Sequence, residues 1–173
     1  DLSALVSDGL LPFEPLYFEG QRQLSAQIAA DLWIKGSPSH LKQVLDILLD
    51  NAFKYSAPGA EVRIGLKKQG NHALLMVANP GPAIPPEELK NIFKRFYRAD
   101  KARAMSGSYG LGLSIAQAIA QQVEAENEEA DDHDDRHEGH VDAGIGDHGN
   151  EAQIRNATGD ELHEIVQQPA GHH

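Results

Sequence analysis

The chain has 173 residues, a formal net charge of −11 and no cysteine. A chain of this length buries one hydrophobic core and hardly a second. Without cysteine it forms no disulfide, thiolate metal site or thiol nucleophile, which is consistent with a reducing compartment. No apolar run approaches the ~20 residues that cross a bilayer, so we expect a soluble fragment, which can be a piece of something larger.

Charge is divided unevenly along the chain. Residues 1–122 hold 13 Lys and Arg against 11 Asp and Glu, whereas residues 123–173 hold 2 against 15. The second segment also lacks aromatic residues and contains seven of the nine histidines. Low hydrophobicity with high net charge is typical of disorder. The sequence therefore predicts one folded domain over 1–122, followed by an acidic, His-rich tail over 123–173 that is foreign to that domain or disordered.

The opening part of the chain predicts one helix and two short strands. Apolar residues recur at helical spacing over 2–11, and Pro12 and Pro15 interrupt this pattern. The segments 24–28 and 32–34 have the composition of strands, with a short connection between them.

Residues 41–56 (LKQVLDILLDNAFKYS) are predicted to form a buried helix, because apolar residues surround almost the whole cylinder. Ser37 and Pro38 supply its N-cap and its first helical position. Asn51 lies in the middle of this helix. A buried amide without a partner costs about 1–3 kcal/mol, so either a neighbouring backbone carbonyl or a group outside the helix is expected to satisfy it.

Two strands followed by two helices are predicted in the next part of the chain. Residues 61–67 alternate as a half-buried strand, a Gly-Asn turn follows at 70–71, and the more apolar 73–78 is expected to be a more central strand. A short helix is predicted at 87–96, and a polar stretch at 98–108 leads to a final apolar helix. Two antiparallel strands behind a helix predict a layered α+β domain.

Three glycines, Gly107, Gly110 and Gly112, stand before the final helix. Glycine lets a ligand approach the backbone, and the free amides and dipole of a helix N-terminus favour anions such as phosphates. The spacing matches neither a Rossmann fingerprint nor a P-loop. On its own, this segment is better explained as a flexible turn.

Four segments occur in one order along the chain: LLDNAFKYS, VANPGPAI, IFKRFYRAD and GSYGLGLSIAQAIA. Together they resemble the N-box, first glycine box, phenylalanine box and second glycine box of the ATP-binding catalytic domain of sensor histidine kinases, which has the Bergerat (GHKL) fold. The resemblance covers about residues 1–122. It implies an α+β sandwich in which a mixed sheet carries three helices on one face. The hairpin that ends the family's sheet has no counterpart after Gln122, so we expect it to be missing or replaced.

The resemblance implies a site for ATP and Mg²⁺. Asn51 would coordinate the Mg²⁺ that bridges the phosphates, Lys54 would approach the phosphates, and Tyr55 would pack beside the base. A core or rim position remains the alternative for Tyr55. The phenylalanine box would anchor a lid over 98–108. The ATP-binding positions implied in this way are Asn51, Lys54, Tyr55, Asn79, Gly81, Ile84, Arg98, Arg103, Gly107, Gly110, Leu111, Gly112 and Leu113.

The sequence departs from the family pattern at three positions. Asn79 replaces the usual Asp that accepts the adenine amino group, and Ala83 replaces a glycine. Ile47 stands one turn before Asn51, where hydrolytic relatives carry a Glu that activates water. We therefore expect weakened nucleotide binding and slow intrinsic hydrolysis of ATP.

The function implied by the resemblance is transfer of the γ-phosphoryl group of ATP to a histidine on a separate dimerisation domain, with a response regulator downstream. We expect no catalytic residue in this fragment, because the resemblance implies that the phosphoacceptor histidine belongs to the dimerisation domain. We expect it to lie in the cytoplasm, without contact with nucleic acid or membrane, as part of a kinase anchored in the bacterial inner membrane. Two alternatives are a nucleotide-binding or pseudokinase regulatory module and an anti-sigma-factor-type serine kinase.

Overall fold

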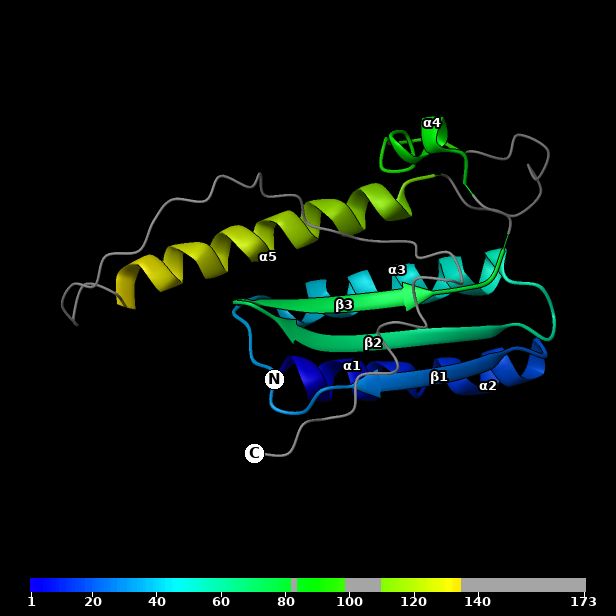
Figure 1. Cartoon of the computed structure of the whole chain (residues 1–173), viewed down its shortest axis with the longest axis horizontal. Coiled ribbons are helices and arrows are strands. Elements are labelled where there is room, and N and C mark those ends of the chain that lie inside the picture. Colours follow the sequence, from blue (N-terminus) through cyan, green and yellow to red (C-terminus); the bar gives the residue numbers. More distant parts are fainter. Residues whose placement is uncertain (82–83, 99–109, 135–173) are drawn as a thin grey trace.

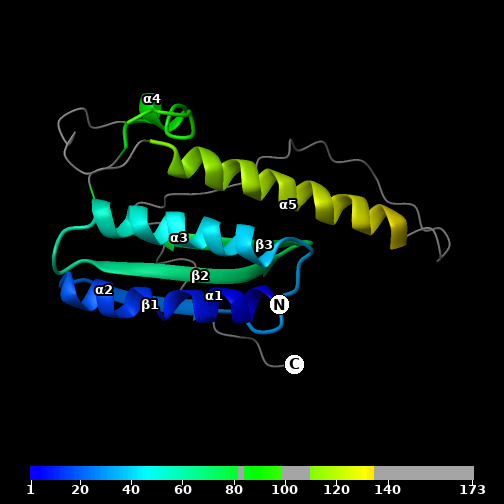
Figure 2. The same ribbon diagram turned by 180° about the vertical axis from the view of Figure 1, so that it is seen from behind.

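The computed structural model describes residues 1–81, 84–98 and 110–134. The helices and strands of these residues are α1 (Leu2–Leu10), α2 (Phe13–Glu19), β1 (Gln23–Ile28), α3 (Pro38–Tyr55), β2 (Glu61–Gln69), β3 (His72–Ala78), α4 (Pro86–Leu89) and α5 (Gly112–Asp134). In Figure 1 the strands form one layer with α1, α2 and α3 behind it, and Figure 2 shows the same helices in front of the sheet. α5 lies alongside α3 in both views. The predicted α+β class, with three helices on one face of the sheet, is confirmed.

The sheet is mixed, as predicted, and the described strands follow the order β1-β2-β3. Ile64 of β2 pairs with Ala26 of the parallel β1 on one side and with Val77 of the antiparallel β3 on the other. The central strand is therefore β2, and the expectation that 73–78 would be central is wrong for the described sheet. β3 is apolar although it lies at the edge, because its C-terminal end is buried and the strand packs against α3.

The hydrophobic core lies between the sheet and the helices behind it. The inward side chains of β2 alternate as predicted and are at most 2% exposed. They form one cluster with side chains of α1, α2 and α3, whose largest fully buried members are Tyr17, Leu45, Leu49, Leu66, Val6 and Val62. A second cluster joins α5 to α3 through Val44, Ala116 and Ile119. α3 is therefore packed on two sides, which fixes its position in the domain.

The N-terminal region contains a helix that the sequence did not indicate. The prolines were expected to interrupt helical structure, yet α2 includes Pro15 at its third position. This is possible because the first N–H groups of a helix have no partner within the helix, so proline loses no hydrogen bond there.

The predicted strand at 32–34 is not formed. The N–H group of Leu2 donates to the carbonyl of Leu32 at 2.8 Å, and the N–H group of Leu32 donates to Oγ of Ser3 at 3.0 Å. Both backbone groups of Leu32 are thus used by the start of α1. The apolar side chains of this loop, Leu32 and Ile34, pack against the core instead of entering the sheet.

The helix predicted at 87–96 is shorter than expected. Only Pro86–Leu89 is helical, and the chain then turns through hydrogen bonds from Asn91 to Glu88 and from Lys94 to Asn91. Phe96 has a φ of 64°, which a right-handed helix does not allow. The central helix begins as predicted, with Ser37 at the N-cap position and Pro38 at the first helical position.

The final helix is longer than expected. α5 runs past Gln122, where the predicted domain ends, to Asp134. Val123 packs against the second cluster, and Asn127 forms hydrogen bonds with the backbone of Lys35 at 2.8 Å. The folded part of the chain therefore reaches at least Asn127. The origin of the following segment stays a prediction, and most of it lies outside the described residues. None of the described helices is long and apolar enough to span a bilayer.

Candidate functional site

The C-terminal half of α3 meets the start of α5. Gly112 is the first residue of α5, and a Cβ atom added there would lie 3.2 Å from Cγ2 of Ile47 and 4.0 Å from Nδ2 of Asn51. The first distance is tighter than ordinary van der Waals contact, so glycine permits the close approach of the two helices. The predicted Mg²⁺ ligand and the second glycine box are therefore neighbours.

The first glycine box lies against the last turn of α3. A Cβ atom on Gly81 would lie 3.1 Å from the carbonyl oxygen of Tyr55 and 3.6 Å from Nδ2 of Asn79. A side chain at Gly81 would thus press on the backbone of the N-box. The absence of a side chain lets the segment that follows β3 pass close to this helix end.

The phenylalanine box pairs with the second glycine box. The N–H group of Phe96 donates to the carbonyl of Gly110 at 2.9 Å. Gly110 has a φ of +67°, and a Cβ atom there would lie 2.6 Å from the carbonyl oxygen of Tyr97. Both the backbone conformation and the lack of space require glycine at this position. The four segments, which are separated along the chain, therefore converge on the C-terminal half of α3.

The amide of Asn51 remains available for a ligand. Its side chain is half-buried, and none of the hydrogen bonds formed among the described residues involves it. The alternative that a backbone carbonyl satisfies this amide is therefore not observed in the described part of the chain. Mg²⁺ takes oxygen ligands, and the amide oxygen of Asn51 is suitable for that role. The residues present fit the group that the resemblance implies.

Two other N-box residues lie at the surface. The ammonium group of Lys54 forms an ion pair with the carboxylate of Asp50, one turn earlier on α3. Their side chains are 33% and 51% exposed, respectively. Tyr55 is 46% exposed, so it belongs to the rim and not to the core. A phosphate beside this position would compete with Asp50 for the ammonium group of Lys54.

The opposite face of α3 is held by residues that no motif indicated. The hydroxyl of Tyr17 donates to the carbonyl of Leu49 at 2.7 Å, and burial raises the pKa of this hydroxyl, so it stays a neutral donor. The guanidinium of Arg22 donates to the carbonyl of Ser56 at the end of the helix. Neither residue stands in a recognisable pattern, since a tyrosine in a helix and an arginine in a polar turn are common.

The other predicted residues are placed only in part. Ile84, Leu111 and Leu113 are partly buried. Cγ of Arg98 lies 3.3 Å from the position of a Cβ atom on Gly110, so the first residue of the predicted lid borders the second glycine box. Positions 103 and 107, where Arg103 and Gly107 were predicted to bind ATP, lie outside the described residues, as do Ala83 and the rest of the lid.

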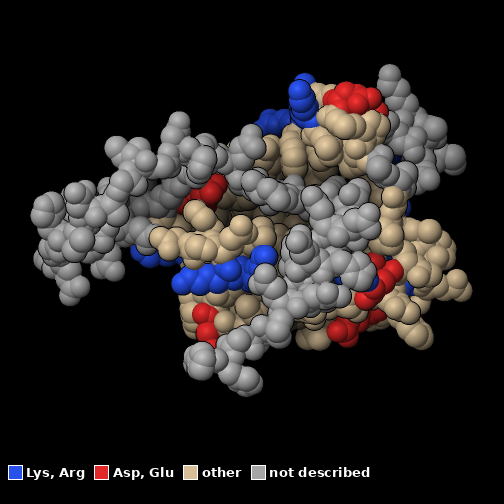
Figure 3. Space-filling model, in the orientation of Figure 1, with Lys and Arg blue, Asp and Glu red and all other residues tan. Residues whose placement is uncertain are grey.

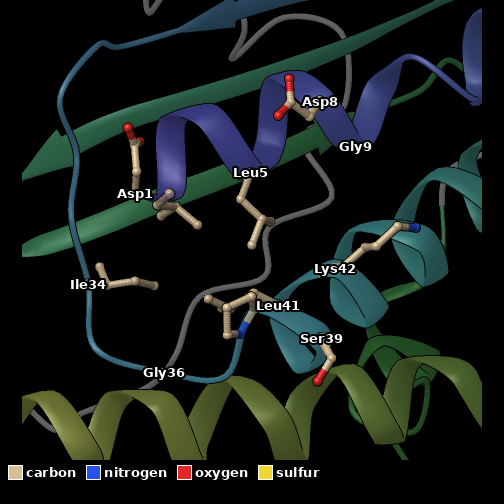
Figure 4. A pocket seen from close by; sticks show the side chains of 11 residues that line it. Asp1, Leu5, Asp8, Gly9, Ile34, Gly36, Ser39, Leu41 and Lys42 are labelled. Atoms are coloured by element: carbon tan, nitrogen blue, oxygen red, sulfur yellow. The ribbon is translucent and has the colours of Figure 1, made fainter.

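Two other surface features lie at the opposite end of the domain. A groove of about 510 Å³ separates α1 from the N-terminus of α3, with Leu5, Ile34 and Leu41 among its lining residues (Figure 4). β2 ends with Lys67 and Lys68, and Figure 3 shows basic side chains on this face of the domain. Both features lie away from Asn51, because α3 and β2 run in opposite directions across the domain.

The fold and this site define a class of α+β domain in which two glycine-rich segments border an asparagine-bearing helix. The family model described as histidine kinase-, DNA gyrase B-, and HSP90-like ATPase matches residues 36–158. The chain belongs to this family of ATPase domains.

Three similar proteins indicate which branch of this family the chain resembles. The chain is 42% identical over 121 residues to the sensor protein DltS of Streptococcus agalactiae serotype III, a match that covers 70% of this chain and 31% of DltS. The solved structure of a mycobacterial sensor histidine kinase, MprB, has a TM-score of 0.60 at 30% identity and covers 70% of this chain and 78% of that one. The histidine kinase ThkA, solved in complex with the response regulator protein TrrA, has a TM-score of 0.60 at 24% identity, covering 71% of this chain and 34% of that one.

These relatives confirm the predicted resemblance to the catalytic domains of sensor histidine kinases, in preference to the two alternatives. The ThkA comparison supports the fold alone because of its lower identity. The chain spans about a third of the length of DltS. The matched family range also continues past Gln122 to residue 158.

Proposed function

We propose that this domain binds ATP with Mg²⁺ beside the C-terminal half of α3 and donates the γ-phosphoryl group to a histidine on a separate dimerisation domain. The observation that carries the proposal is the approach of Asn51 to Gly112. It brings an amide that forms no hydrogen bond with the described residues to the N-terminus of a long helix. Such a helix end attracts phosphates through its free N–H groups and its dipole.

Each bordering segment has a distinct part in binding. The amide oxygen of Asn51 would hold Mg²⁺, and the N–H groups that begin α5, from Gly110 to Gly112, would bind the phosphates. Asn79, beside Gly81, would accept the adenine amino group. When bound, Mg²⁺ neutralises charge on the phosphates, which is the main requirement of phosphoryl transfer. These assignments are supported by the positions of the residues around α3.

The residue one turn before Asn51 supports transfer to a protein in preference to water. Ile47 packs against Gly112 and offers no group that could activate a water molecule. Slow hydrolysis would preserve ATP until a phosphoacceptor arrives. We propose a histidine-bearing dimerisation domain as that acceptor and a response regulator as the next partner, because DltS is named a sensor protein and MprB a sensor histidine kinase.

Titration calorimetry of the chain with ATP, with and without Mg²⁺, tests the binding step. We expect binding that is much tighter with Mg²⁺. Incubation with γ-labelled ATP and a cognate dimerisation domain then tests transfer, and the label should be acid-labile and alkali-stable, as expected for phosphohistidine. Binding without transfer would favour a regulatory module, and the absence of binding would contradict the proposal.

A further inference from the structure

We propose that Arg22 is a positioning residue for the nucleotide site. It holds the last turn of α3 so that Asn51 and the backbone of Tyr55 keep their places beside the two glycine boxes. The inference rests on the proposed function, because it concerns the same site. Arg22 itself contacts Gly20, Phe53 and Ser56.

The guanidinium of Arg22 makes three hydrogen bonds to backbone carbonyls. Nε and Nη2 donate to the carbonyl of Ser56 at 3.1 and 2.7 Å, and Nη1 donates to the carbonyl of Gly20 at 2.8 Å. The carbonyls at a helix C-terminus lack partners within the helix and carry partial negative charge. A planar fork of donors suits two bonds to one carbonyl, which the single ammonium group of lysine does not reproduce.

The same guanidinium also packs on the N-box helix. Its Cζ atom lies 4.2 Å from the centroid of the Phe53 ring, a cation–π contact. The Tyr17 ring also packs edge-on against Phe53, with ring centroids 5.3 Å apart. The turn at Gly20 is equally close, since a Cβ atom there would lie 2.6 Å from Cε2 of Phe53. The last turn of α3 is thus fixed both along its axis and in rotation.

Rotation matters because the two faces of α3 have different tasks. Leu49, Phe53 and Ser56 recur at helical spacing on the face held by α2 and the following turn. Asn51 lies about 200° around the helix from Leu49, by the 100° step of an α-helix, and so points to the glycine boxes. A shift of the turn held by Arg22 would move Asn51 away from Gly112 and the Tyr55 carbonyl away from Gly81. Both contacts are close, so a small shift would alter them.

The variants Arg22→Met and Arg22→Lys in the full chain test this inference. Arg63→Met serves as a control matched in chemistry, since Arg63 pairs with the partly exposed Glu61 on β2. Val6→Ala serves as a control for lost stability, since Val6 is fully buried on α1. Titration calorimetry with ATP, in Mg²⁺ and in EDTA, is done at a temperature where circular dichroism shows every variant folded.

We expect Arg22→Met to weaken Mg²⁺-dependent ATP binding about tenfold, Arg22→Lys to weaken it less, and both controls to bind as the parent chain does. Amide hydrogen exchange should show faster exchange at residues 51–56 in Arg22→Met but not in Val6→Ala. If Arg22→Met does not fold, ATP binding by Arg22→Lys is compared with the parent chain and the two controls instead.

Two results would overturn the inference, and they distinguish failure of the role of Arg22 from failure of the proposed function. If the parent chain binds ATP and the Arg22 variants bind it equally well, or no worse than a Val6→Ala variant of the same melting temperature, Arg22 has only a structural role. If the parent chain does not bind ATP, the proposed function fails and the inference fails with it.

Discussion

Lys54 forms an ion pair with Asp50, and it would exchange this carboxylate for a phosphate when a nucleotide binds. Both side chains are partly exposed, and an exposed pair at this spacing contributes only about 0.3–0.5 kcal/mol. The carboxylate of Asp50 therefore holds Lys54 weakly, yet it also adds negative charge where phosphates are expected. Its net effect on ATP binding should be unfavourable.

We expect Asp50→Asn to bind ATP about two- to threefold more tightly at low salt, because Lys54 is released and a repulsive charge is removed. The gain should shrink as salt is raised. Asp46→Asn is the matched control, since Asp46 pairs with Lys42 in the same way on the same helix. Titration calorimetry would contradict this account if Asp50→Asn bound ATP less tightly, or if both variants behaved alike.

Asn79 offers an uncharged acceptor beside Gly81. Neutral hydrogen bonds contribute about 0.5–1.5 kcal/mol and those to charged groups about 1.5–3 kcal/mol. Asn79→Asp should therefore bind ATP roughly tenfold more tightly, the equivalent of about 1.4 kcal/mol. GTP is the control ligand, because its base has a carbonyl in place of the adenine amino group and should gain nothing. Equal or poorer ATP binding by the variant would count against the assigned role.

Among the elements, α5 is attached to the loop before α3 by the side chain of Asn127. The amide of Asn127 accepts from the N–H group of Lys35 and donates to its carbonyl, both at 2.8 Å, although the two residues are far apart in sequence. It also donates to the carbonyl of Val123 at 2.6 Å. These hydrogen bonds of Asn127, called the Asn127 clasp below, join α5 to the loop before α3 at a point beyond the second cluster.

Loss of this clasp should loosen α5 without disturbing the nucleotide site. We expect Asn127→Ala to lower the free energy of unfolding by about 1 kcal/mol, the typical net value of a partly exposed hydrogen-bonded amide. Chemical denaturation would measure this loss, and hydrogen exchange should rise in α5 after Ile119. Gln122→Ala is the control, since among the described residues its amide bonds to Glu126 of the same helix. An unchanged stability for Asn127→Ala would show that the clasp contributes nothing.

The elements that could be predicted are those whose local sequence pattern favours the same structure as their packing in the domain. The alternation of β2, the turn at Gly70 and the start of α3 at Pro38 all depend on local chemistry, and the structure confirms them. The loop at 32–34 was missed because its apolar residues dock on α1, a contact that no local pattern reveals. The length of α5 was missed because Val123 and Asn127 attach an otherwise polar segment.

The same division applies to the site. The motifs indicated which segments would meet, and the contacts of Gly81, Gly110 and Gly112 agree with that expectation. The Asp50–Lys54 pair and the hold of Arg22 on Ser56 were not foreseen. They depend on side-chain choices among several partners and on a tertiary contact between a turn and a helix end.

In the molecule as a whole, α3 belongs both to the hydrophobic core and to the expected nucleotide site. One side of this helix enters the main core with the sheet and α1, and another side carries α5 through the second cluster. The expected nucleotide site lies at its C-terminal end, whereas the groove of Figure 4 lies at its N-terminal end. A ligand beside Asn51 would therefore touch both α3 and the start of α5, and its binding should stabilise their packing.

The most direct test of the account is the Mg²⁺ dependence of ATP binding in Asn51→Ala, measured by titration calorimetry beside the parent chain. Asn71→Ala, in the exposed turn between β2 and β3, is the matched control. We expect Asn51→Ala to lose at least about tenfold in affinity in Mg²⁺, since a metal ligand is removed, and to differ little from the parent chain in EDTA. Unchanged affinity of Asn51→Ala in Mg²⁺ would contradict the central claim that this amide holds the ion against the phosphates.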